Sequence, residues 1–334
     1  MRGLLGIEGG HWGDRLYGRL SRGQGFFFEG WGDLSPWLGG ALMERLKTPH
    51  RIEIEWEPAR RVGGASVRQG RFASPLEASL LPIESRAAHV LEIRPSGHPR
   101  GPTCVHMAAT GDEGFGRRLK TLATPLLEAG IGSIILENPY YGLRRPNGQR
   151  GVALARVSDL FAMGAASIME GLALVDWLDR QGVRQIGVTG VSMGGQMAAT
   201  VGALTPLPVA LAPCIASHSA VPVFTEGMLS FGCDWEKLGA THASPRQAHE
   251  ALRDLLEQTD LRQAPPPSPG VSVVQVAARR DAYVPQRCAH VIHRHFKGAE
   301  LHWLDTGHVA GFVLHREAFI RAIRRAFERL DARR

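Results

Sequence analysis

The sequence is poor in cysteine, in lysine and in long apolar runs, and each shortage excludes a class of protein. Its four cysteines are Cys104, Cys214, Cys233 and Cys288. No two of them have the Cys-x-x-Cys spacing of zinc or thioredoxin-type redox sites, so we expect buried, reduced thiols and no metal. No apolar run approaches the ~18 residues of a membrane span, and the first residues lack the apolar segment of a secretory signal. These absences predict a cytoplasmic protein without a transmembrane segment.

The charge of the chain is unbalanced, because 39 Lys and Arg residues stand against 32 Asp and Glu residues and give a formal net charge of +7. Such a balance raises the question of a nucleic-acid or anionic-lipid partner. Only four of the 39 basic residues are lysines, however, and the arginines occur as scattered pairs without interleaved aromatic residues. Together with abundant glycine, alanine and proline, this fits a G+C-rich coding bias, so we expect no nucleic-acid partner.

The remaining composition is that of an ordinary globular protein. Apolar residues make up 44% and charged residues 21% of the 334 positions, which excludes global disorder and fibrous classes. This length can form one large α/β domain or two small ones, with a core that needs no disulfide bonds.

From residue 86 onwards, short apolar runs alternate with longer amphipathic segments. The runs predict strands at 88–93, 103–109, 131–137, 185–191, 207–212, 271–277 and 300–304. The segments between and after them predict helices at 115–129, 158–180, 193–204, 285–296 and 313–330. Apolar strands that alternate with helices are typical of a mainly parallel sheet with helices on both faces, so we expect an α/β fold.

Two parts of the chain depart from this rhythm. Residues 1–85 are irregular, with one strand-like stretch at 50–57. Residues 214–270 form a long insertion between two expected strands, with one good helix candidate at 245–258. Insertions of this length are often lids over a binding site, and an ordinary surface excursion is the alternative. We therefore predict an α/β domain over 86–334 with a lid-like insertion and an N-terminal extension.

The strongest chemical feature is a Gly-x-Ser-x-Gly motif centred on Ser192. Such a motif is common by chance, but here an expected strand leads in and an expected helix leads out, as in a nucleophile elbow. A serine on so tight a turn needs neighbours without a Cβ atom, and Gly190 and Gly194 meet this need. The alternative is a phosphate-binding turn, but no Gly-x-Gly-x-x-Gly or P-loop motif follows the first strand.

A nucleophilic serine needs a base and an orienting acid, which in this type of fold follow it in the order Ser, Asp or Glu, His. Asp281 follows the strand expected at 271–277, and His308 follows the strand expected at 300–304. We predict that His308 accepts the proton of Ser192 and that Asp281 orients the imidazole.

Neighbouring residues compete for these roles or modify them. His302 lies within an expected strand, where it cannot reach a loop site, and Asp305 shares a loop with the histidine it would have to orient. Arg279 and Arg280 directly precede Asp281 and should favour the charged form of its carboxyl group. The remaining histidines lack the spacing of an H-E-x-x-H metal motif.

Acyl transfer also needs N–H donors for the oxyanion that forms on the substrate carbonyl. One donor is expected from the backbone of Met193, the residue after the nucleophile. The second should come from the loop after the strand at 103–109, with Thr110 as first candidate and Gly111 as second. This loop lacks the usual His-Gly start. We expect Asp112 to brace it, and a plain turn is the alternative.

Several longer sequence blocks resemble one known family. They are Gly30-Trp31-Gly32, Ser74-Pro75, Pro82-Ile83-Glu84-Ser85, Thr110-Gly111-Asp112, Asn138-Pro139-Tyr140-Tyr141-Gly142, Val157-Ser158-Asp159-Leu160-Phe161, Ser192-Met193-Gly194-Gly195, Pro213-Cys214, Phe224-Thr225-x-Gly227, Asp281-Ala282-Tyr283-Val284-Pro285 and Gly307-His308. On these blocks the chain resembles the α/β-hydrolase superfamily and, within it, the family of α/β-hydrolase domain-containing protein 18. The resemblance implies an α/β-hydrolase fold, a triad of Ser192, Asp281 and His308, and an extension (1–85) packed on the same unit.

One block carries residues with open roles. Tyr140 and Tyr141 follow an expected strand at the rim where ligands bind in open α/β sheets. They either line an acyl pocket and bind substrate or pack in the core.

The sequence therefore predicts a serine hydrolase that cleaves a carboxylic ester through an acyl-enzyme, as a carboxylesterase or lipase-like enzyme does, without a cofactor. The apolar segments of the insertion favour a lipid or another small-molecule apolar ester as substrate. A non-catalytic hydrolase-fold binding protein is the main alternative. Anion binding and acyltransferase, peptidase or perhydrolase chemistry stay open, and the oligomeric state is not predicted.

Overall fold

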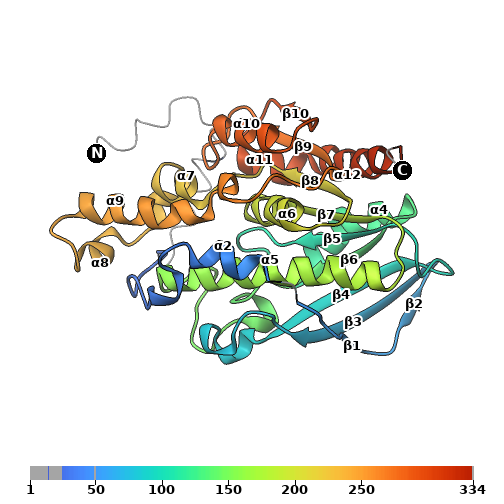
Figure 1. The fold of residues 1–334 in the computed structure, drawn as a ribbon, viewed down its shortest axis with the longest axis horizontal. Coiled ribbons are helices and arrows are strands. Elements are labelled where there is room, and N and C mark those ends of the chain that lie inside the picture. Colours follow the sequence, from blue (N-terminus) through green and yellow to red (C-terminus); the bar gives the residue numbers. More distant parts are fainter. Residues whose placement is uncertain (1–13, 15–24, 49, 333–334) are drawn as a thin grey trace.

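The computed structural model describes Asp14 and residues 25–48 and 50–332, which form an α/β fold around one large sheet (Figure 1). The strands are β1 (Glu55–Trp56), β2 (Arg60–Val62), β3 (Ala65–Ala73), β4 (Ala87–Pro95), β5 (Thr103–Met107), β6 (Gly132–Leu136), β7 (Ile186–Val191), β8 (Val209–Cys214), β9 (Ser272–Ala278) and β10 (Glu300–Leu304). Their order is β1-β3-β4-β6-β5-β7-β8-β9-β10, and β2 pairs with β3.

The central part of the sheet is parallel. Every neighbouring pair from β6 to β10 in this order runs parallel, whereas β4 and the strands beyond it join antiparallel. The predicted α/β class with a mainly parallel sheet is therefore confirmed. In such a sheet the carboxyl ends of the parallel strands share one edge, and ligands bind at that edge.

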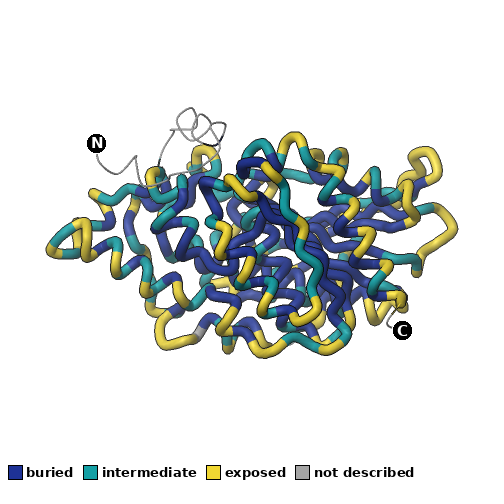
Figure 2. Tube along the Cα trace, turned by 90° about the horizontal axis from the view of Figure 1, so that it is seen from above, coloured by how far each residue is buried: buried dark blue, intermediate teal, exposed yellow. Residues whose placement is uncertain are grey.

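Helices cover both faces of the sheet. The α-helices are α2 (Ala41–Leu46), α3 (Gly116–Arg118), α4 (Thr124–Glu128), α5 (Val157–Arg180), α6 (Met193–Leu204), α7 (Ala220–Thr225), α8 (Trp235–Gly239), α9 (Pro245–Leu256), α10 (Gln286–His295), α11 (His308–Leu314) and α12 (Arg316–Asp331). Successive strand residues point to opposite faces: Cys104 joins the apolar cluster under α12, and Val105 joins the cluster that contains α5 and α6. The central strands are accordingly buried along their length (Figure 2).

Helix α5 is the central helix of one face. Among the described residues it is the one helix long and apolar enough to cross a membrane, and 67% of its most apolar 18-residue window is buried inside the protein. It packs against α2, α6 and the sheet. These contacts explain its apolar composition as that of a core helix.

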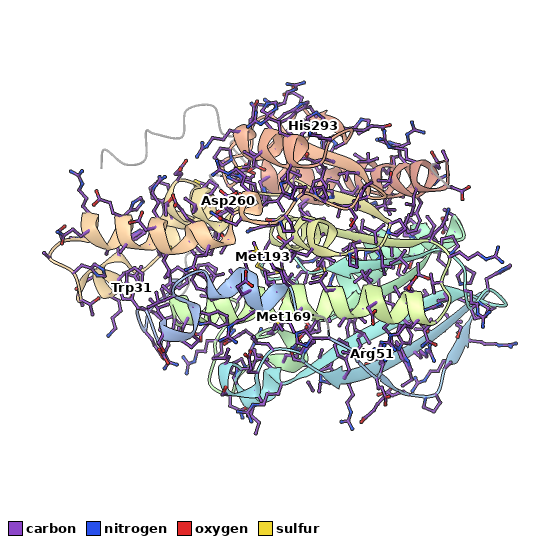
Figure 3. The ribbon with its side chains drawn as sticks, viewed as in Figure 1. Trp31, Arg51, Met169, Met193, Asp260 and His293 are labelled. Atoms are coloured by element: carbon purple, nitrogen blue, oxygen red, sulfur yellow. The ribbon has the colours of Figure 1, made fainter. Side chains whose placement is uncertain are left out.

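Residues 25–48 and 50–85 of the N-terminal extension pack on the rest of the chain. Strand β3 pairs with β4 along its whole length, from Ala65 opposite Pro95 to Ala73 opposite Ala87. The extension also contacts the insertion, because Phe26 forms a β-bridge with Cys233. In addition, the indole of Trp31 donates a hydrogen bond of 3.0 Å to the Leu238 carbonyl (Figure 3).

The insertion at 214–270 is largely helical. Helices α8 and α9 lie at one end of the molecule, at the left of Figure 1, and α7 lies between them and the sheet. Only α9 was expected from the sequence. Helices α7 and α8 are short, at six and five residues, and such lengths give too little periodicity to detect.

The structure differs from the sequence prediction at three further places. The helix predicted at 313–330 is two helices, α11 and α12, separated at His315. The helix predicted at 115–129 contains a π-helical segment, Leu119–Ala123. In the stretch 50–57 only the two residues of β1 form a strand, and the longer strand β3 comes later, after β2 and a tight turn at residues 63–64.

Candidate active site

The backbone at Ser192 has the conformation of a nucleophile elbow. Ser192 follows β7 directly and precedes α6, and its φ of 57° is one that L-residues rarely adopt. A Cβ atom on Gly190 would lie 2.2 Å from the Gly194 carbonyl oxygen, and one on Gly194 would lie 2.5 Å from the Met107 carbonyl oxygen. Both flanking glycines are therefore required by close backbone contacts.

The three residues singled out for catalysis meet at the carboxyl edge of the sheet. The Oγ of Ser192 lies 2.9 Å from Nε2 of His308, and Nδ1 of His308 lies 2.7 Å from Oδ2 of Asp281. With a neutral imidazole, Ser192 donates to Nε2, and the Nδ1–H group donates to the carboxylate. The side chains of His308 and Asp281 are 11% and 2% exposed, so water competes little for these bonds.

Backbone groups orient the carboxylate of Asp281. Its Oδ1 accepts hydrogen bonds from the N–H groups of Tyr283, at 2.8 Å, and Val284, at 2.7 Å, which leaves Oδ2 directed at His308. The two preceding arginines do not pair with this carboxylate. Arg280 pairs with Asp305 at 3.2 Å, and the guanidinium of Arg279 lies over the Trp303 ring, at 5.2 Å from its centre.

A second carboxylate, that of Asp14, lies beside the histidine. It is fully buried and accepts hydrogen bonds from the backbone N–H groups of Ala282, His308 and Val309 at 3.0, 2.8 and 2.8 Å. Burial on its own lowers the pKa of His308, but the charge and hydrogen bond of Asp281 and the charge of Asp14 outweigh it and raise that pKa. Asp14 was not predicted from the sequence, because a lone aspartate in an irregular stretch has no pattern around it.

The rival residues do not join this group. His302 lies on β10, with Nε2 3.5 Å from a carboxylate oxygen of Glu300. Asp305 is 78% exposed at its side chain and pairs with Arg280. Within the described part of the chain, no three or more His, Cys, Asp or Glu side chains gather where a metal ion could be held.

Two backbone N–H groups were proposed to face the substrate oxyanion. Met193 is the first residue of α6, where an N–H group has no partner within the helix. Thr110 lines the same cavity as Ser192, and its hydroxyl donates a 3.6 Å hydrogen bond to Sδ of Met193. Gly111, the second candidate, is not among the residues that line this cavity. This geometry favours Thr110 over Gly111.

Asp112 braces the loop that carries Thr110. Its N–H group donates to the Ala109 carbonyl at 3.1 Å, and its carboxylate lies 2.9 Å from Nε of the buried Arg118. Arg118 in turn donates to the His106 carbonyl at 3.0 Å. The loop is thus tied to the end of β5 by a buried ion pair.

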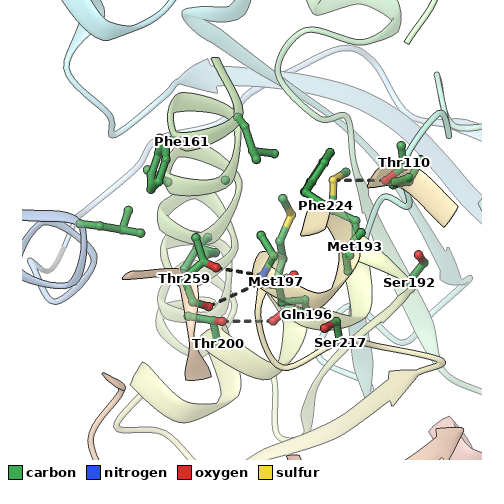
Figure 4. Close-up of a pocket in the computed structure, with 18 of the residues that line it drawn as sticks. Thr110, Phe161, Ser192, Met193, Gln196, Met197, Thr200, Ser217, Phe224 and Thr259 are labelled. Atoms are coloured by element: carbon green, nitrogen blue, oxygen red, sulfur yellow. Dashed lines mark hydrogen bonds between the residues drawn. The ribbon is translucent and has the colours of Figure 1, made fainter. Parts of the chain in front are cut away.

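A mostly apolar cavity of about 910 Å³, part of it open to solvent, adjoins Ser192 (Figure 4). Phe161 and Ile168 of α5, Met197 of α6 and Phe224 of α7 contribute to its walls. The polar residues on its lining are partly paired with one another. For example, Gln196 donates to the Thr259 carbonyl at 3.4 Å, and the Thr200 hydroxyl donates to the Gln196 carbonyl at 3.1 Å.

The insertion forms one wall of this cavity and also contacts the loop of the acid. The N–H group of Met228 donates a 3.0 Å hydrogen bond to the carbonyl of Ala282, next to Asp281. The side chains of Val223 and Leu229 line the cavity and pack on Tyr283. The insertion therefore borders the site and touches the loop of Asp281.

Tyr140 and Tyr141 pack in the core and do not line the cavity. Tyr141 is fully buried, and its hydroxyl lies 3.4 Å from the Val152 carbonyl. The hydroxyl of Tyr140, which is 5% exposed, donates to Asp159 at 3.4 Å. The proposed role of both tyrosines in substrate binding is thus replaced by the packing alternative.

One family is matched by nearly the whole chain. It is described as alpha/beta hydrolase domain containing 18, and residues 24–246 and 239–329 match it.

Solved structures with a similar fold include several esterases. An acetyl xylan esterase from Paenibacillus sp. R4 is 14% identical with a TM-score of 0.61, and the match covers 90% of this chain and 97% of that one. Acetyl xylan esterase 1 from Thermoanaerobacterium sp. JW/SL YS485 is 15% identical with a TM-score of 0.62, over 91% and 96% of the two chains. A cold-adapted esterase from an Arctic intertidal metagenomic library is 17% identical with a TM-score of 0.52, over 82% and 99%. At these identities the similarity establishes the α/β-hydrolase fold.

Proposed function

Because this chain belongs to the alpha/beta hydrolase domain containing 18 family, we propose that it is a serine hydrolase that cleaves carboxylic esters. The observation that supports the proposal is the continuous hydrogen-bonded series from Ser192 through His308 to Asp281, at 2.9 and 2.7 Å. Esterases among the solved structures of similar fold agree with it.

In the proposed reaction, the Oγ of Ser192 attacks the ester carbonyl carbon while His308 takes its proton at Nε2. The carbonyl π electrons move onto the oxygen, and the N–H groups of Met193 and Thr110 stabilise that oxyanion. When the oxyanion collapses, the bond to the leaving alkoxide breaks, and His308 gives its proton to that alkoxide, which leaves as the alcohol. Water, activated by the same imidazole, then hydrolyses the acyl-enzyme and regenerates Ser192.

The chemical step can be tested by covalent labelling. A fluorophosphonate probe should label the wild-type protein, and labelling should be lost in Ser192→Ala, because the probe reacts with an activated serine. Ser35→Ala is a suitable control, since that exposed hydroxyl donates only to the Asp33 carboxylate in the N-terminal extension. Folded wild-type protein that stays unlabelled would refute the proposal.

We further propose that the acyl group is apolar, as in a lipid or another hydrophobic ester. The walls of the cavity beside Ser192 are built mainly from Leu, Ile, Met, Val and Phe side chains. Each methylene buried there contributes about 0.8 kcal/mol, or up to about fourfold in kcat/KM. In a p-nitrophenyl ester series, kcat/KM should therefore rise from acetate to longer acyl chains. A constant or falling series would exclude this substrate class.

A cytoplasmic location is part of the proposal. All four cysteines are buried and unpaired, which suits a reducing compartment. Fractionation of cells that produce the protein would test it.

A further inference from the structure

The carboxylate of Asp14 connects the two loops that carry the base and the acid of the triad. Oδ2 accepts from the N–H of Ala282, next to Asp281, at 3.0 Å and from the N–H of His308 at 2.8 Å. Oδ1 accepts from the N–H of Val309 at 2.8 Å. One side chain, about 270 residues or more away in sequence, thus spans the ends of β9 and β10.

Burying the Asp14 carboxylate costs free energy, because the charged group is removed from water. A carboxylate that is 0% exposed loses its hydration, and three N–H donors are what replaces it. The donors are the N–H groups of His308 and Val309, the first two residues of α11, and the N–H group of Ala282, the residue after Asp281. The oxygens of Asp14 therefore hold the backbone at His308 and Val309 and the backbone next to Asp281, while Asp281 orients the imidazole ring.

We infer that Asp14 is a positioning residue of the triad, which holds the loops of Asp281 and His308 in register and supplies a second negative charge that stabilises the imidazolium formed during acyl transfer. This inference rests on the proposed serine-hydrolase function. Asp14 does not contact the reacting atoms, so it acts through His308. Its place in the N-terminal extension means that the extension completes the active site.

The groups around His308 determine how its titration responds. Asp281 and Asp14 face it, Ser192 lies at Nε2, and the ring of Tyr283 lies beside it, with ring centres 5.1 Å apart. Arg280 and Asp305, on the flanking loops, pair with each other. Removing the charge of Asp14 should lower the pKa of His308, because that charge helps to raise it.

The experiment compares Asp14→Asn and Asp14→Glu with wild type in the pH dependence of fluorophosphonate labelling. Asp14→Asn should lower the plateau rate about tenfold or more, because a misplaced base costs on the order of 10- to 100-fold. It should also move the acid limb of the pH profile, the range in which labelling falls as pH falls, to lower pH. His308 must be neutral to act as a base, and the loss of the Asp14 charge lowers its pKa. Asp14→Glu keeps the charge and lengthens the side chain, so it should lower the plateau and leave the limb in place. Asp33→Asn, an exposed carboxylate bonded to Ser35, is the matched control and should behave as wild type.

The inference would be overturned if Asp14→Asn had the wild-type plateau labelling rate and the wild-type acid limb of the pH profile. A lower plateau rate with an unmoved acid limb would also overturn it, because that result indicates only a structural role. If Asp14→Asn does not fold, Asp14→Glu provides the test. A wild-type plateau rate together with a wild-type acid limb in Asp14→Glu would refute the inference. If wild type itself is not labelled, the proposed function fails instead. The His308 titration can then be followed by NMR in Ser192→Ala, with and without Asp14→Asn, and an unchanged pKa of His308 would refute the charge effect.

Discussion

Arg144 and Glu170 form a bidentate ion pair in which both side chains are completely buried. The two contacts measure 2.7 Å from Nη1 to Oε2 and 2.6 Å from Nη2 to Oε1. Arg144 also donates to the Ser85 carbonyl, and Glu170 accepts from the Ser74 hydroxyl. The pair therefore links the N-terminal extension, α5 and the loop after β6, which are separate in the sequence.

Breaking this pair should strongly destabilise the protein. Glu170→Gln leaves the Arg144 guanidinium buried without its countercharge, and we expect the free energy of unfolding to fall by about 3–5 kcal/mol. Urea unfolding followed by circular dichroism would measure it. Asp176→Asn, in the partly exposed pair with Arg180, is the control and should cost less than about 1 kcal/mol. Equal losses in the two variants would contradict this prediction.

Glu137 makes stability depend on pH near neutrality. Burial raises its pKa to about 7, against the lowering effects of the Gly114 N–H group and of Arg118 and Arg144. The folded pKa lies above the value of 4.5 in the unfolded chain, so the native state holds an extra proton between these values, and stability falls as pH rises through that window.

Glu137→Gln should therefore remove part of the pH dependence. Between pH 5 and pH 8 the wild type should lose on the order of 1–3 kcal/mol more than the variant, measured by urea unfolding at both pH values. Glu128→Gln, at an exposed position at the end of α4, should keep the wild-type dependence. A Glu137→Gln protein with an unchanged pH slope would show that this carboxyl group does not titrate in the window.

A larger side chain at Gly164 should shorten the cavity without displacing the neighbouring residues. It lies on α5 at the cavity wall, and nothing lies within 4 Å of a Cβ atom placed there. Gly164→Leu should reduce kcat/KM for long-chain p-nitrophenyl esters at least tenfold and leave the acetate within about twofold, because only the far part of the acyl chain loses space. Gly164→Ala, which adds one methyl group, is the control. Equal losses for short and long esters would place the acyl chain elsewhere.

The centre of the fold was predictable because its strands are apolar throughout. The strand predicted at 185–191 is β7 at Ile186–Val191, and the helix after it is α6 at Met193–Leu204. The rule that acid and base follow successive strands then placed Asp281 and His308 on the two loops that meet at Ser192.

The parts that escaped prediction depend on contacts between distant residues. Strand β3 alternates buried and exposed residues irregularly and carries Arg68 and Arg71, so it lacks the apolar signal of the central strands. The partner of Arg144 and the donors to Asp14 follow from tertiary structure alone. Nothing in a single sequence marks either residue as paired.

The hydrogen bond from Met228 to Ala282 limits which substitutions the insertion can accept. The same segment of the insertion borders the cavity beside Ser192 and contacts the loop of Asp281, so we expect a change that reshapes this wall to shift Asp281 as well. Exchanging this segment for that of a relative is therefore expected to disturb the loop of Asp281. Helix α5 forms another part of the wall and carries none of Ser192, Asp281 and His308, so substitutions on α5 should change ligand preference without moving these three residues.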